Sequence, residues 1–482
     1  MYKKYSDFYR FVQVTLFSVT TISFFFINTG CRVGPDYKTP ELKTPDKFET
    51  NLSNIQSDVS GDLSTWWTNM NDPLLNSIID EVLQDNLDIK IAADRIDQAQ
   101  AFRGIISGTD KPQVNVQGSG MREKYSLNSL FGPFLSNQYE NDFIGALGAR
   151  WELDLFGKNA RSLEAADATV EATIENKSAV MVLMSAQVAK EYIHLRQLQN
   201  QISVAKDNIQ IQEDTIQIVQ QRFDVGLVNE LVLQQAKAQL EATKSILPSL
   251  DTAMRRSIHR IGILTGKEPR ALENKLIADA NIPATQPVIP IGLPSELLLR
   301  RPDVRRAERN LAAATANIGV ATADLFPRFS LTGALGLEST QFSRFAESDS
   351  QYWTLGTGIS WPIIDFGTIR SNIKLQNAKQ KEAMDIYVKS TLGAFEDVEN
   401  ALVTYGNEQE RLGFLEAETF ASQRTFDLAK DRYRQGLVDF LNVLDAQRQL
   451  YRAQDALTVS KGQLAIDLVI LYESLGGGWD MN

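Results

Sequence analysis

The chain of 482 residues is poor in the residue types that build disulfide frameworks and many catalytic or metal sites. Its one cysteine is Cys31, so no disulfide can form within the chain. Its two histidines, His194 and His259, lie in helical patterns far apart in the sequence, where packing roles are expected. The sequence shows no nucleophile–base pair, no metal-ligand cluster and no phosphate-binding loop. We therefore expect a protein that is not an enzyme and that uses no cofactor or metal.

Basic charge and long apolar runs are also scarce. Lys and Arg number 49 against 60 Asp and Glu, and the net charge of −11 argues against nucleic acid as a partner. Beyond the N-terminus no stretch of roughly 18 apolar residues occurs, so no internal transmembrane helix is expected. Lys3, Lys4 and Arg10 precede the apolar run 11–27, which is too short and too polar for a good spanning helix. Residues 1–30 are therefore interpreted as a secretory signal peptide.

Two copies of one pattern, 210 residues apart, organise the rest of the chain. Gly226-Leu227 and Gly436-Leu437 each precede a segment with an apolar residue at every seventh position. The two series are Leu233, Leu240, Leu247, Met254 and Ile261, and Val443, Leu450, Leu457, Leu464 and Leu471. Such a repeat is typical of coiled-coil helices, and glycine commonly ends a helix. The sequence therefore predicts a duplicated architecture in which each turn joins two long helices.

Long helices are expected on both sides of these turns. The segment 158–223 contains neither proline nor glycine, and a helix of that length is roughly 100 Å long. Its counterpart is 368–435. Return helices are expected at 230–264, broken by Pro248, and at 440–475. Polar residues cover much of these helices, which favours a hollow α-helical barrel over a solid bundle.

Each repeat also contains a pair of alternating segments, expected at about 112–122 and 141–155 and at about 327–338 and 351–364. Each segment is apolar on one side and small or polar on the other, and Trp361 near the end of the last one is a candidate interface anchor. The alternation is typical of membrane-spanning β-strands, although a soluble half-buried sheet shows it too. The signal peptide favours the membrane. Because unpaired strand edges are costly in lipid, four strands must be completed by other copies of the chain.

Caps and prolines divide the remaining residues. Asp72 is a candidate N-cap with Pro73 at the first helical position, and they open a helix that runs to about Ile106. The segment 267–294 holds several prolines and is interpreted as the linker between the repeats. The expected divisions are an N-terminal segment 31–72, a first repeat 73–266, this linker, a second repeat 295–475 and a tail 476–482.

Five short strings are spread along the whole chain. They are Val33-Gly34-Pro35-Asp36-Tyr37, Thr65-Trp66-Trp67, Arg301-Pro302-Asp303-Val304-Arg305, Asp324-Leu325-Phe326-Pro327 and Leu475-Gly476-Gly477-Gly478-Trp479. Together they resemble the TolC-like outer-membrane factors, in the lipoprotein branch that serves efflux pumps. The resemblance implies a mainly α fold with membrane β-structure. It also implies a homotrimer that shares one barrel of about twelve strands, continued by a long α-helical coiled-coil barrel. Segments 31–72 and 267–294 would form a belt around the helices.

The end of the apolar run, Asn28-Thr29-Gly30-Cys31, resembles a bacterial lipoprotein signal. The resemblance implies lipidation of Cys31, with palmitate among the acyl groups, and anchoring to the lipid of the outer membrane. Arg32, rather than Asp, follows the cysteine, which in many such lipoproteins permits export to that membrane. The family prefers Leu at the position of Asn28. An ordinary signal peptide with an incidental cysteine is the alternative.

The resemblance implies a passive exit duct that extends into the periplasm. Drugs, metals or other small toxic compounds would arrive from an inner-membrane pump through a periplasmic adaptor protein. A duct for type I protein secretion is one alternative, which the lipoprotein cysteine and the Gly-Gly-Gly-Trp ending disfavour. A non-channel coiled-coil adaptor or surface fibre is another, but it would not need four alternating strands placed symmetrically in two repeats.

The same resemblance assigns roles at the two turns. Leu441 and Asp445 match the hydrophobic and acidic constriction rings of the family's periplasmic gate, and Asn442 stands where many relatives have a second Asp. Three Asp445 carboxylates near one axis would favour cations. Gly226-Leu227 and Gly436-Leu437 match the adaptor-docking tips. From the residues alone, Leu441 equally suits a coiled-coil core, Asp445 a solvated carboxylate near a helix N-terminus, and the glycines simple helix ends.

Overall fold

The computed structural model describes residues 32–45, 47–48, 55–56, 63–126, 128, 130, 139–283, 289–290 and 294–480. The expected signal peptide and Cys31 lie outside these residues. The chain forms two compact units. Unit 1 comprises Met1–Pro40, Ile96–Ala172 and Ala307–Tyr387, and unit 2 comprises Glu41–Arg95, Thr173–Arg306 and Val388–Asn482. Each unit therefore draws on both repeats, and neither repeat forms a unit alone.

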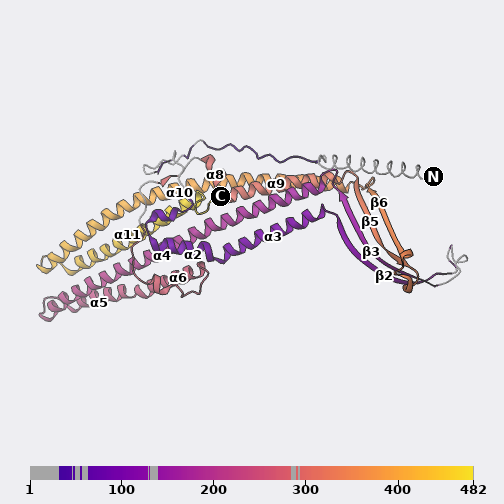
Figure 1. The fold of residues 1–482 in the computed structure, drawn as a ribbon. Coiled ribbons are helices and arrows are strands. Elements are labelled where there is room, and N and C mark those ends of the chain that lie inside the picture. The colour runs from indigo at the N-terminus through magenta and orange to yellow at the C-terminus, as the bar shows by residue number, and fades with distance from the viewer. Residues whose placement is uncertain are drawn as a thin grey trace, which may run out of the picture. The chain divides into compact units, whose positions relative to one another are not determined.

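A four-stranded antiparallel sheet is the β-structure of unit 1, and its strands lie side by side in Figure 1. Its order is β2 (Gln113–Lys124), β3 (Tyr139–Leu153), β5 (Arg328–Ser339) and β6 (Gln351–Ser360). The two hairpins, one from each repeat, join directly through β3 and β5. Two short turns of 3₁₀ helix, η3 (Phe342–Arg344) and η4 (Ser348–Ser350), connect β5 to β6.

The register aligns the apolar residues of all four strands on one face. Leu147 of β3 lies opposite Val116 of β2 and Leu335 of β5, and Leu335 lies opposite Trp353 of β6. These four side chains are 51–81% exposed. The other face carries small and polar residues such as Gln117, which pairs with Ala146. An apolar surface this continuous on an otherwise polar protein marks an interaction site.

Strand β6 ends earlier than the sequence pattern predicted. Its last residue is Ser360, whereas the alternation had been extended to residue 364, because Pro362 has no N–H to donate to a ladder. Trp361 and Ile363 therefore lie outside the strand. The indole of Trp361 instead donates a hydrogen bond of 3.0 Å to the carbonyl of Leu325, just before β5. The other three strands begin and end within two residues of their expected bounds.

The two longest helices are α4 (Lys158–Asp224) and α10 (Thr368–Arg434), each with 67 residues. Their return helices are α5 (Glu230–Lys244) with α6 (Leu247–Leu264), and α11 (Phe440–Ser474). Helices α5 and α6 are separate because a proline occupies the first turn of α6. In both seven-residue series four members are buried, and the fifth, Leu247 or Leu457, is half-buried. The seven-residue series therefore mark the buried faces of these return helices.

The helix expected from Asp72 to Ile106 is two helices, α2 (Pro73–Asp85) and α3 (Leu87–Thr109). Asp72 caps α2 as expected, because its carboxylate accepts hydrogen bonds of 2.9 and 3.1 Å from two backbone N–H groups of the first turn. Asn86 separates the helices with an extended backbone. Its side-chain oxygen accepts from the N–H groups of the next helix at 2.8 and 3.2 Å. An asparagine that caps the next helix in this way ends the previous one.

The linker between the repeats contains short elements. Helix α7 (Glu273–Leu276) is followed by β4 (Ile289–Pro290), which pairs in parallel with β1 (Ile55–Gln56). Helices α8 (Pro294–Arg300) and α9 (Pro302–Ala323) then open the second repeat. None of the helices in the described part of the chain combines the length and apolar character needed to cross a membrane.

Candidate functional site

The two helix hairpins end in the same turn. Gly226 and Gly436 have φ angles of 74° and 76°, in the left-handed region that favours glycine. Each glycine N–H bonds to the carbonyl three residues back, and the N–H of the following leucine bonds to the carbonyl five residues back. This pair of bonds is the Schellman motif, so both glycines are helix terminators. Leu227 and Leu437 follow them with exposed side chains.

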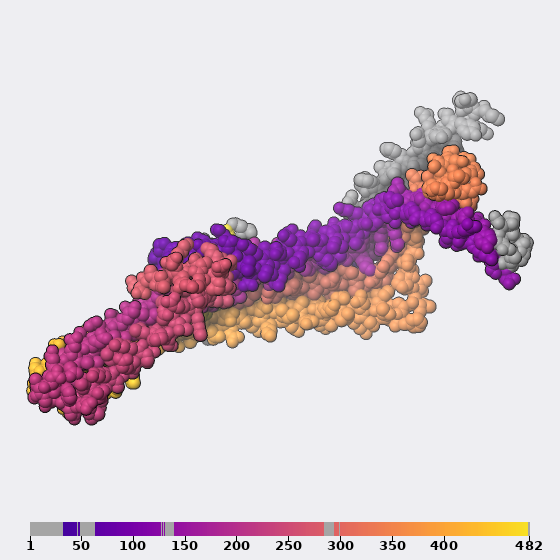
Figure 2. Space-filling model, turned by 90° about the horizontal axis from the view of Figure 1, so that it is seen from below, coloured from indigo at the N-terminus to yellow at the C-terminus, as the bar shows by residue number. Residues whose placement is uncertain are grey.

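The hairpins pack against each other within unit 2. The magenta surface of the α4–α5 hairpin carries yellow atoms of the α10–α11 hairpin along its edge in Figure 2. Their shared apolar core consists of Val219, Leu233, Ala236, Phe426, Tyr433, Phe440, Val443, Leu444, Ala446 and Leu450. Two arginines link them further. Arg222 lies 4.6 Å from the centre of the Tyr433 ring and donates to the carbonyl of Arg434 at 3.2 Å. Arg448 donates to Gln239 at 2.7 Å.

The three predicted gate residues lie together at the start of α11. Leu441, Asn442 and Asp445 are all exposed, whereas Val443 and Leu444 are buried in the core between the hairpins. Leu441 keeps 54% of its surface exposed, so it is not part of the coiled-coil core of this chain. Asn442 donates a side-chain hydrogen bond of 3.4 Å to the carbonyl preceding the helix. The three residues therefore form an exposed stripe at the start of α11.

A segment near the N-terminus, residues 32–40, binds along unit 1, and we call it the strap. Its backbone donates from Val33 to the carbonyl of Phe156 at 3.2 Å. A Cβ at Gly34 would overlap the backbone of Gly319, so only glycine fits there. Arg161 is 2% exposed and donates to Asp36 at 2.7 Å and to the carbonyl of Val33 at 3.1 Å. The strap is thus held by steric fit and by a buried cation.

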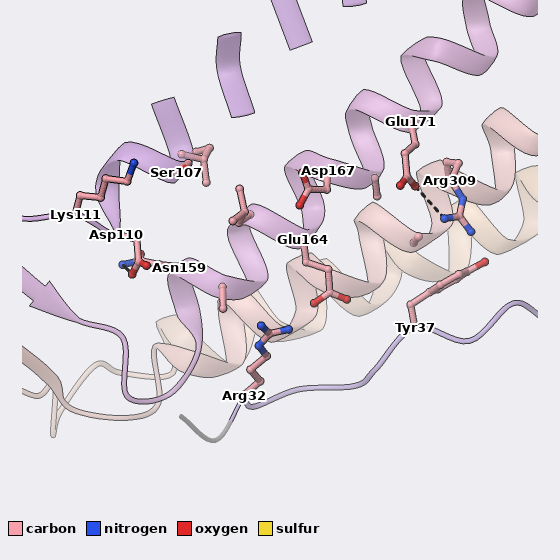
Figure 3. Close-up of a pocket in the computed structure, with 15 residues that line it drawn as sticks. Arg32, Tyr37, Ser107, Asp110, Lys111, Asn159, Glu164, Asp167, Glu171 and Arg309 are labelled. Atoms are coloured by element: carbon pink, nitrogen blue, oxygen red, sulfur yellow. Dashed lines mark hydrogen bonds and ion pairs between the residues drawn. The ribbon is translucent and has the colours of Figure 1, made fainter. Parts of the chain in front are cut away.

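Tyr37 is the side-chain anchor of the strap (Figure 3). Its ring packs on a small apolar cluster that includes Ala168 and Ala312, and its hydroxyl bonds to Glu308. Burial, together with the hydrogen bond to the Glu308 carboxylate, raises the pKa of Tyr37. Arg309 lies 5.7 Å from the ring centre and forms an ion pair with Glu171 at 2.9 Å.

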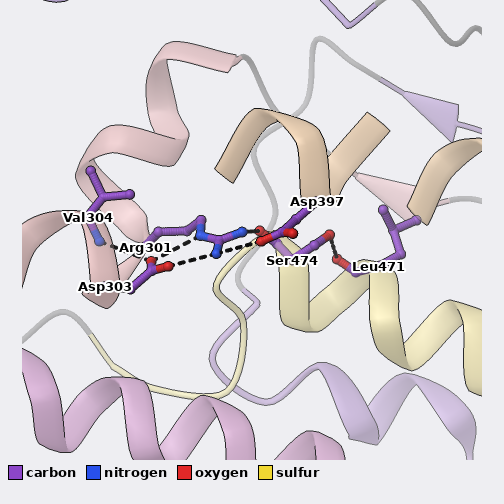
Figure 4. Close-up of polar contacts among 6 residues, drawn as sticks. All are labelled: Arg301, Asp303, Val304, Asp397, Leu471 and Ser474. Carbon is purple, nitrogen blue, oxygen red and sulfur yellow. Dashed lines mark hydrogen bonds and ion pairs between the residues drawn. The ribbon is translucent and has the colours of Figure 1, made fainter. Parts of the chain in front are cut away.

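Arg301, from one of the five strings, connects the start of α9 with α10 and α11 in unit 2 (Figure 4). Its guanidinium donates two hydrogen bonds to Asp303, at 3.0 and 2.8 Å, and one to Asp397 at 2.9 Å. It also donates to the carbonyl of Ser474 at 2.9 Å, at the end of α11. Burial alone would raise the pKa of Asp303, but the two bonds from Arg301 outweigh it and hold this pKa below its usual range.

The C-terminal tail completes the same region. Trp66 of η1 (Trp66–Met70) stacks on Tyr472 with ring centres 5.2 Å apart. Gly478 donates its N–H to the carbonyl of Leu63 at 2.9 Å, and a Cβ there would lie 2.6 Å from the hydroxyl of Ser185. The glycines of the tail are therefore needed for close packing, and no phosphate-binding role is required to explain them.

Sequence reasoning missed the residues that hold these parts together. It gave no role to Arg222, whose guanidinium contacts the Tyr433 ring. It had no signal for Arg161, because a single arginine in a helical pattern does not reveal that it is buried. Within the described residues, no group of three or more His, Cys, Asp or Glu residues is placed to hold a metal ion.

Known proteins resemble the chain over most of its length. The family model described as outer membrane efflux protein matches residues 78–267 and 293–477. Nodulation protein T of Rhizobium leguminosarum bv. trifolii is 30% identical over 96% of this chain and 97% of its own length. The probable outer membrane lipoprotein SilC of Salmonella typhimurium is 28% identical over 97% of this chain and 99% of its own.

Solved structures agree with the family match. The outer-membrane channel OprN has a TM-score of 0.87 and 36% identity, covering 93% of this chain and all of its own. The predicted TolC-like family is thereby confirmed, and with it the mainly α fold with a strand sheet; the matched family is one of outer-membrane efflux proteins. The chain belongs to the outer membrane efflux protein family.

Proposed function

We propose that the chain is the outer-membrane exit duct of a tripartite efflux system. It would passively conduct small molecules, such as drugs or metals, that an inner-membrane pump delivers through a periplasmic adaptor. The observation that carries this proposal is the exposed apolar face that runs in register across all four strands of the sheet. Such a face suits lipid, and the small and polar residues of the other face suit a water-filled lumen.

The sheet supports closure by copies of the same chain. Strands β2 and β6 are its edges, and an open edge in lipid is prohibitively costly. With an even number of antiparallel strands, β6 of one copy meets β2 of the next in antiparallel orientation, as closure requires. The number three comes from the family resemblance, and three copies would give about twelve strands.

The internal repeat gives the register of this seam. Within one chain Arg150 of β3 lies opposite Thr332 of β5. The counterpart of Arg150, 210 residues on, is Ser360 of β6. The counterpart of Thr332 is Gln117 of β2, because the two hold equivalent places in their hairpins. We therefore place Ser360 of one copy opposite Gln117 of the next.

An exposed aromatic residue supports the same seam. Phe156 stacks on Phe326 of the second repeat, with ring centres 4.6 Å apart. Its counterpart Phe366 is 98% exposed and has a φ angle of 50°, which is unusual for a bulky residue. A neighbouring copy would cover Phe366 as the second repeat covers Phe156.

The hairpin turns supply the proposed gate and docking tips. The exposed stripe of Leu441, Asn442 and Asp445 would line the axis at the periplasmic end, as a hydrophobic and acidic constriction. The exposed Leu227 and Leu437, each after a glycine turn, would contact the adaptor. The strap would carry lipidated Cys31, and the lipoprotein named among the relatives supports this anchor.

Single-channel conductance in a planar bilayer tests the proposal. We expect small, cation-preferring currents from the purified protein and a several-fold rise when Leu441→Ala is combined with Asp445→Ala. The matched control is Leu231→Ala with Gln235→Ala, the repeat equivalents on α5, which should leave the conductance unchanged. If well-formed oligomers of both proteins pass no current, the channel proposal is wrong, and a coiled-coil adaptor or surface fibre becomes the better explanation.

A further inference from the structure

Two basic side chains gather around one aromatic ring at the end of the sheet that is remote from the helices. Strand β2 begins soon after α3 and ends at Lys124, which pairs with Tyr139 at the start of β3. The Arg122 guanidinium lies 5.4 Å from the centre of the Tyr139 ring, and the Lys124 ammonium lies 5.6 Å from it. These cation–π contacts hold both charges beside the same ring.

The register places the two cations on the apolar face of the sheet. Val116 of β2 lies on that face, opposite Leu147 of β3. Arg122 and Lys124 follow Val116 by even numbers of residues, and even separations along a strand keep side chains on one face. Both cations are exposed, and within the described part of the chain neither has an ion-pair partner.

The carboxylates of the same strand ends lie on the opposite face. Glu123 of β2 pairs directly with Glu140 of β3, and Asp142 follows Glu140 by two residues. The side chain of Tyr125 hydrogen-bonds to both Glu123 and Glu140, so these two carboxylates share one side. The strand ends therefore present cations toward the apolar face and carboxylates toward the small and polar face, which is the proposed lumen.

An aromatic contact on the apolar face marks the level of these cations. Phe143 of β3 meets Phe342 of η3 edge-on, with ring centres 5.4 Å apart. Phe143 lies opposite Gly120, and Arg122 and Lys124 lie beyond it along β2 by about 7 and 14 Å, at roughly 3.4 Å per residue. Aromatic girdles mark the membrane interface of outer-membrane barrels, so cations just beyond such rings lie at the level of lipid headgroups.

The proposed seam between copies leaves this face open. It joins β2 edge to edge with β6 of the next copy, and side chains stand roughly perpendicular to a sheet. With Ser360 opposite Gln117, the antiparallel register brings Trp353 of the next copy opposite Lys124. Trp353 belongs to the apolar face and is 75% exposed. The seam would therefore add a second aromatic ring beside the cations without burying them.

We propose that Arg122 and Lys124, grouped around Tyr139, bind the phosphate groups of a glycolipid in the outer leaflet of the membrane. The proposal rests on the proposed function, because only a sheet embedded with its apolar face in lipid brings headgroups to these cations. Guanidinium and ammonium groups form charge-assisted hydrogen bonds with phosphate oxygens.

The charge pattern and the position select the class of lipid. The carboxylates of these strand ends lie on the other face, so they cannot pair with the ammonium of a zwitterionic headgroup. Two cations on one face therefore favour an anionic headgroup. The site lies at the outer leaflet, which in outer membranes consists largely of phosphorylated glycolipid, and this lipid is the occupant to which the proposal commits.

Native mass spectrometry of the full-length protein tests the site. Detergent-solubilised oligomers are mixed with bisphosphorylated lipid A, phosphatidylglycerol or phosphatidylethanolamine, and the bound lipid is counted. We expect lipid A to be retained about tenfold better than phosphatidylethanolamine. Arg122→Gln and Lys124→Gln should each weaken the retention of lipid A several-fold, and the double variant should lose the preference over phosphatidylethanolamine.

Two control variants separate the site from the net charge of the protein. Arg150→Gln removes a positive charge from the other face of β3 and should leave lipid retention unchanged. Glu123→Gln makes the same strand end more positive, but on the face turned away from lipid, and should not strengthen retention. An increase with Glu123→Gln as large as the loss with Arg122→Gln would overturn the site. Intact oligomers in the same spectra show that each variant assembles.

Two further comparisons separate the lipid sources and the two proposals. Retention of phosphatidylglycerol as strong as that of lipid A would overturn the glycolipid assignment, and retention of lipid A that survives the double variant would overturn the site. Channel currents are recorded from the same samples. Normal currents without selective lipid retention would refute this site alone. Selective retention that the double variant abolishes, without any current from the wild type, would refute the channel alone.

Discussion

Arg222 of α4 places its guanidinium 4.6 Å from the centre of the Tyr433 ring of α10, so one side chain joins the ends of the two helix hairpins. The same guanidinium donates to the carbonyl of Arg434 at 3.2 Å. A cation–π contact of this kind contributes about 0.5–2 kcal/mol, and a charged hydrogen bond about 1.5–3 kcal/mol. Both contacts lie beside the proposed gate.

Arg222→Ala should loosen the hairpins and raise the open probability of the channel several-fold in bilayer recordings. Its matched control is Arg432→Ala, the repeat equivalent, whose side chain is exposed. We expect wild-type currents from this control. Identical currents from both variants would show that the Arg222 contact does not restrain opening.

Gly436→Trp should abolish efflux without dissociating the oligomer. The glycine has a φ of 76° and lies at an exposed turn, so a large side chain would protrude where the adaptor is proposed to dock. Gly436→Ala introduces the same backbone strain, about 1–2 kcal/mol, without the bulk and should keep most efflux. The readout is drug resistance in a deletion strain complemented with each variant, and unchanged resistance with Gly436→Trp would reject the docking role.

A disulfide should form across the proposed seam when Ser360→Cys is combined with Gln117→Cys. Directly opposed residues have Cβ atoms about 4.5–5.5 Å apart, and a small backbone shift brings them within the roughly 4.5 Å that a disulfide needs. Asn115→Cys with Ser360→Cys lies two residues out of register on the same face and should cross-link poorly. Non-reducing gel electrophoresis would show a covalent oligomer for the first pair only. Stronger cross-linking of the second pair would reject the register derived from the repeat.

Arg301→Lys should destabilise unit 2 by roughly 2 kcal/mol, because an ammonium cannot reproduce the paired bonds of the guanidinium to Asp303. The readout is the thermal unfolding of the detergent-solubilised protein. Arg424→Lys, at an exposed position of α10, is the control. Equal melting temperatures for both variants would mean that the paired hydrogen bonds from Arg301 to Asp303 contribute nothing to stability.

We predict that the difference in stability between the wild type and an Asp467 variant depends on pH. The side chain of Asp467 is 2% exposed, one oxygen accepts from Gln463 at 2.7 Å, and the other has no partner among the described residues. Burial is the main cause that raises the pKa of Asp467, and the nearby Glu408 raises it further. Asp467 lines a cavity of unit 2, and the charged residues that share this lining are Lys190, Arg301, Asp397 and Glu473.

A raised pKa in the folded state means that the contribution of Asp467 to stability is present at low pH and is lost as the pH rises through that pKa. Asp467→Asn keeps the bond from Gln463 and removes the charge. It should unfold like the wild type near pH 4 and at a higher temperature near pH 8. Asp427→Asn is the control, because Gln423 donates to that exposed carboxylate in the same way, at 3.2 Å. A constant difference across the pH range would contradict the prediction.

Periodicity made most of the secondary structure predictable. The seven-residue series, the cap at Asp72 and the glycine turns are local patterns, and such patterns can be recognised in a single sequence. The end of β6 was missed because the alternation continues through Trp361 and Ile363 although Pro362 stops the ladder. The break at Asn86 was missed because the apolar pattern continues across it.

The contacts that join distant segments were not predictable in this way. Examples are the contact of Arg222 with the Tyr433 ring, the hydrogen bonds from Arg161 to the strap, and the hydrogen bond from Gly478 to Leu63. Each depends on which segments the fold brings together. No spacing rule connects residues so far apart, and their partners became visible only with the fold. For the gate, the sequence supplied the positions by resemblance, and the structure adds only that Leu441, Asn442 and Asp445 share an exposed stripe.

The bond between Gly478 and Leu63 also constrains the order of assembly. It joins the C-terminal tail to the segment just before α2, and Trp66 is buried against Tyr472 in the same place. In export that begins at the N-terminus, as the proposed function implies, Trp66 cannot be buried before Tyr472 has emerged. Closure of unit 2 becomes a late event in biogenesis, and a chain shortened by only its final glycines would remain open to proteases at its N-terminal end.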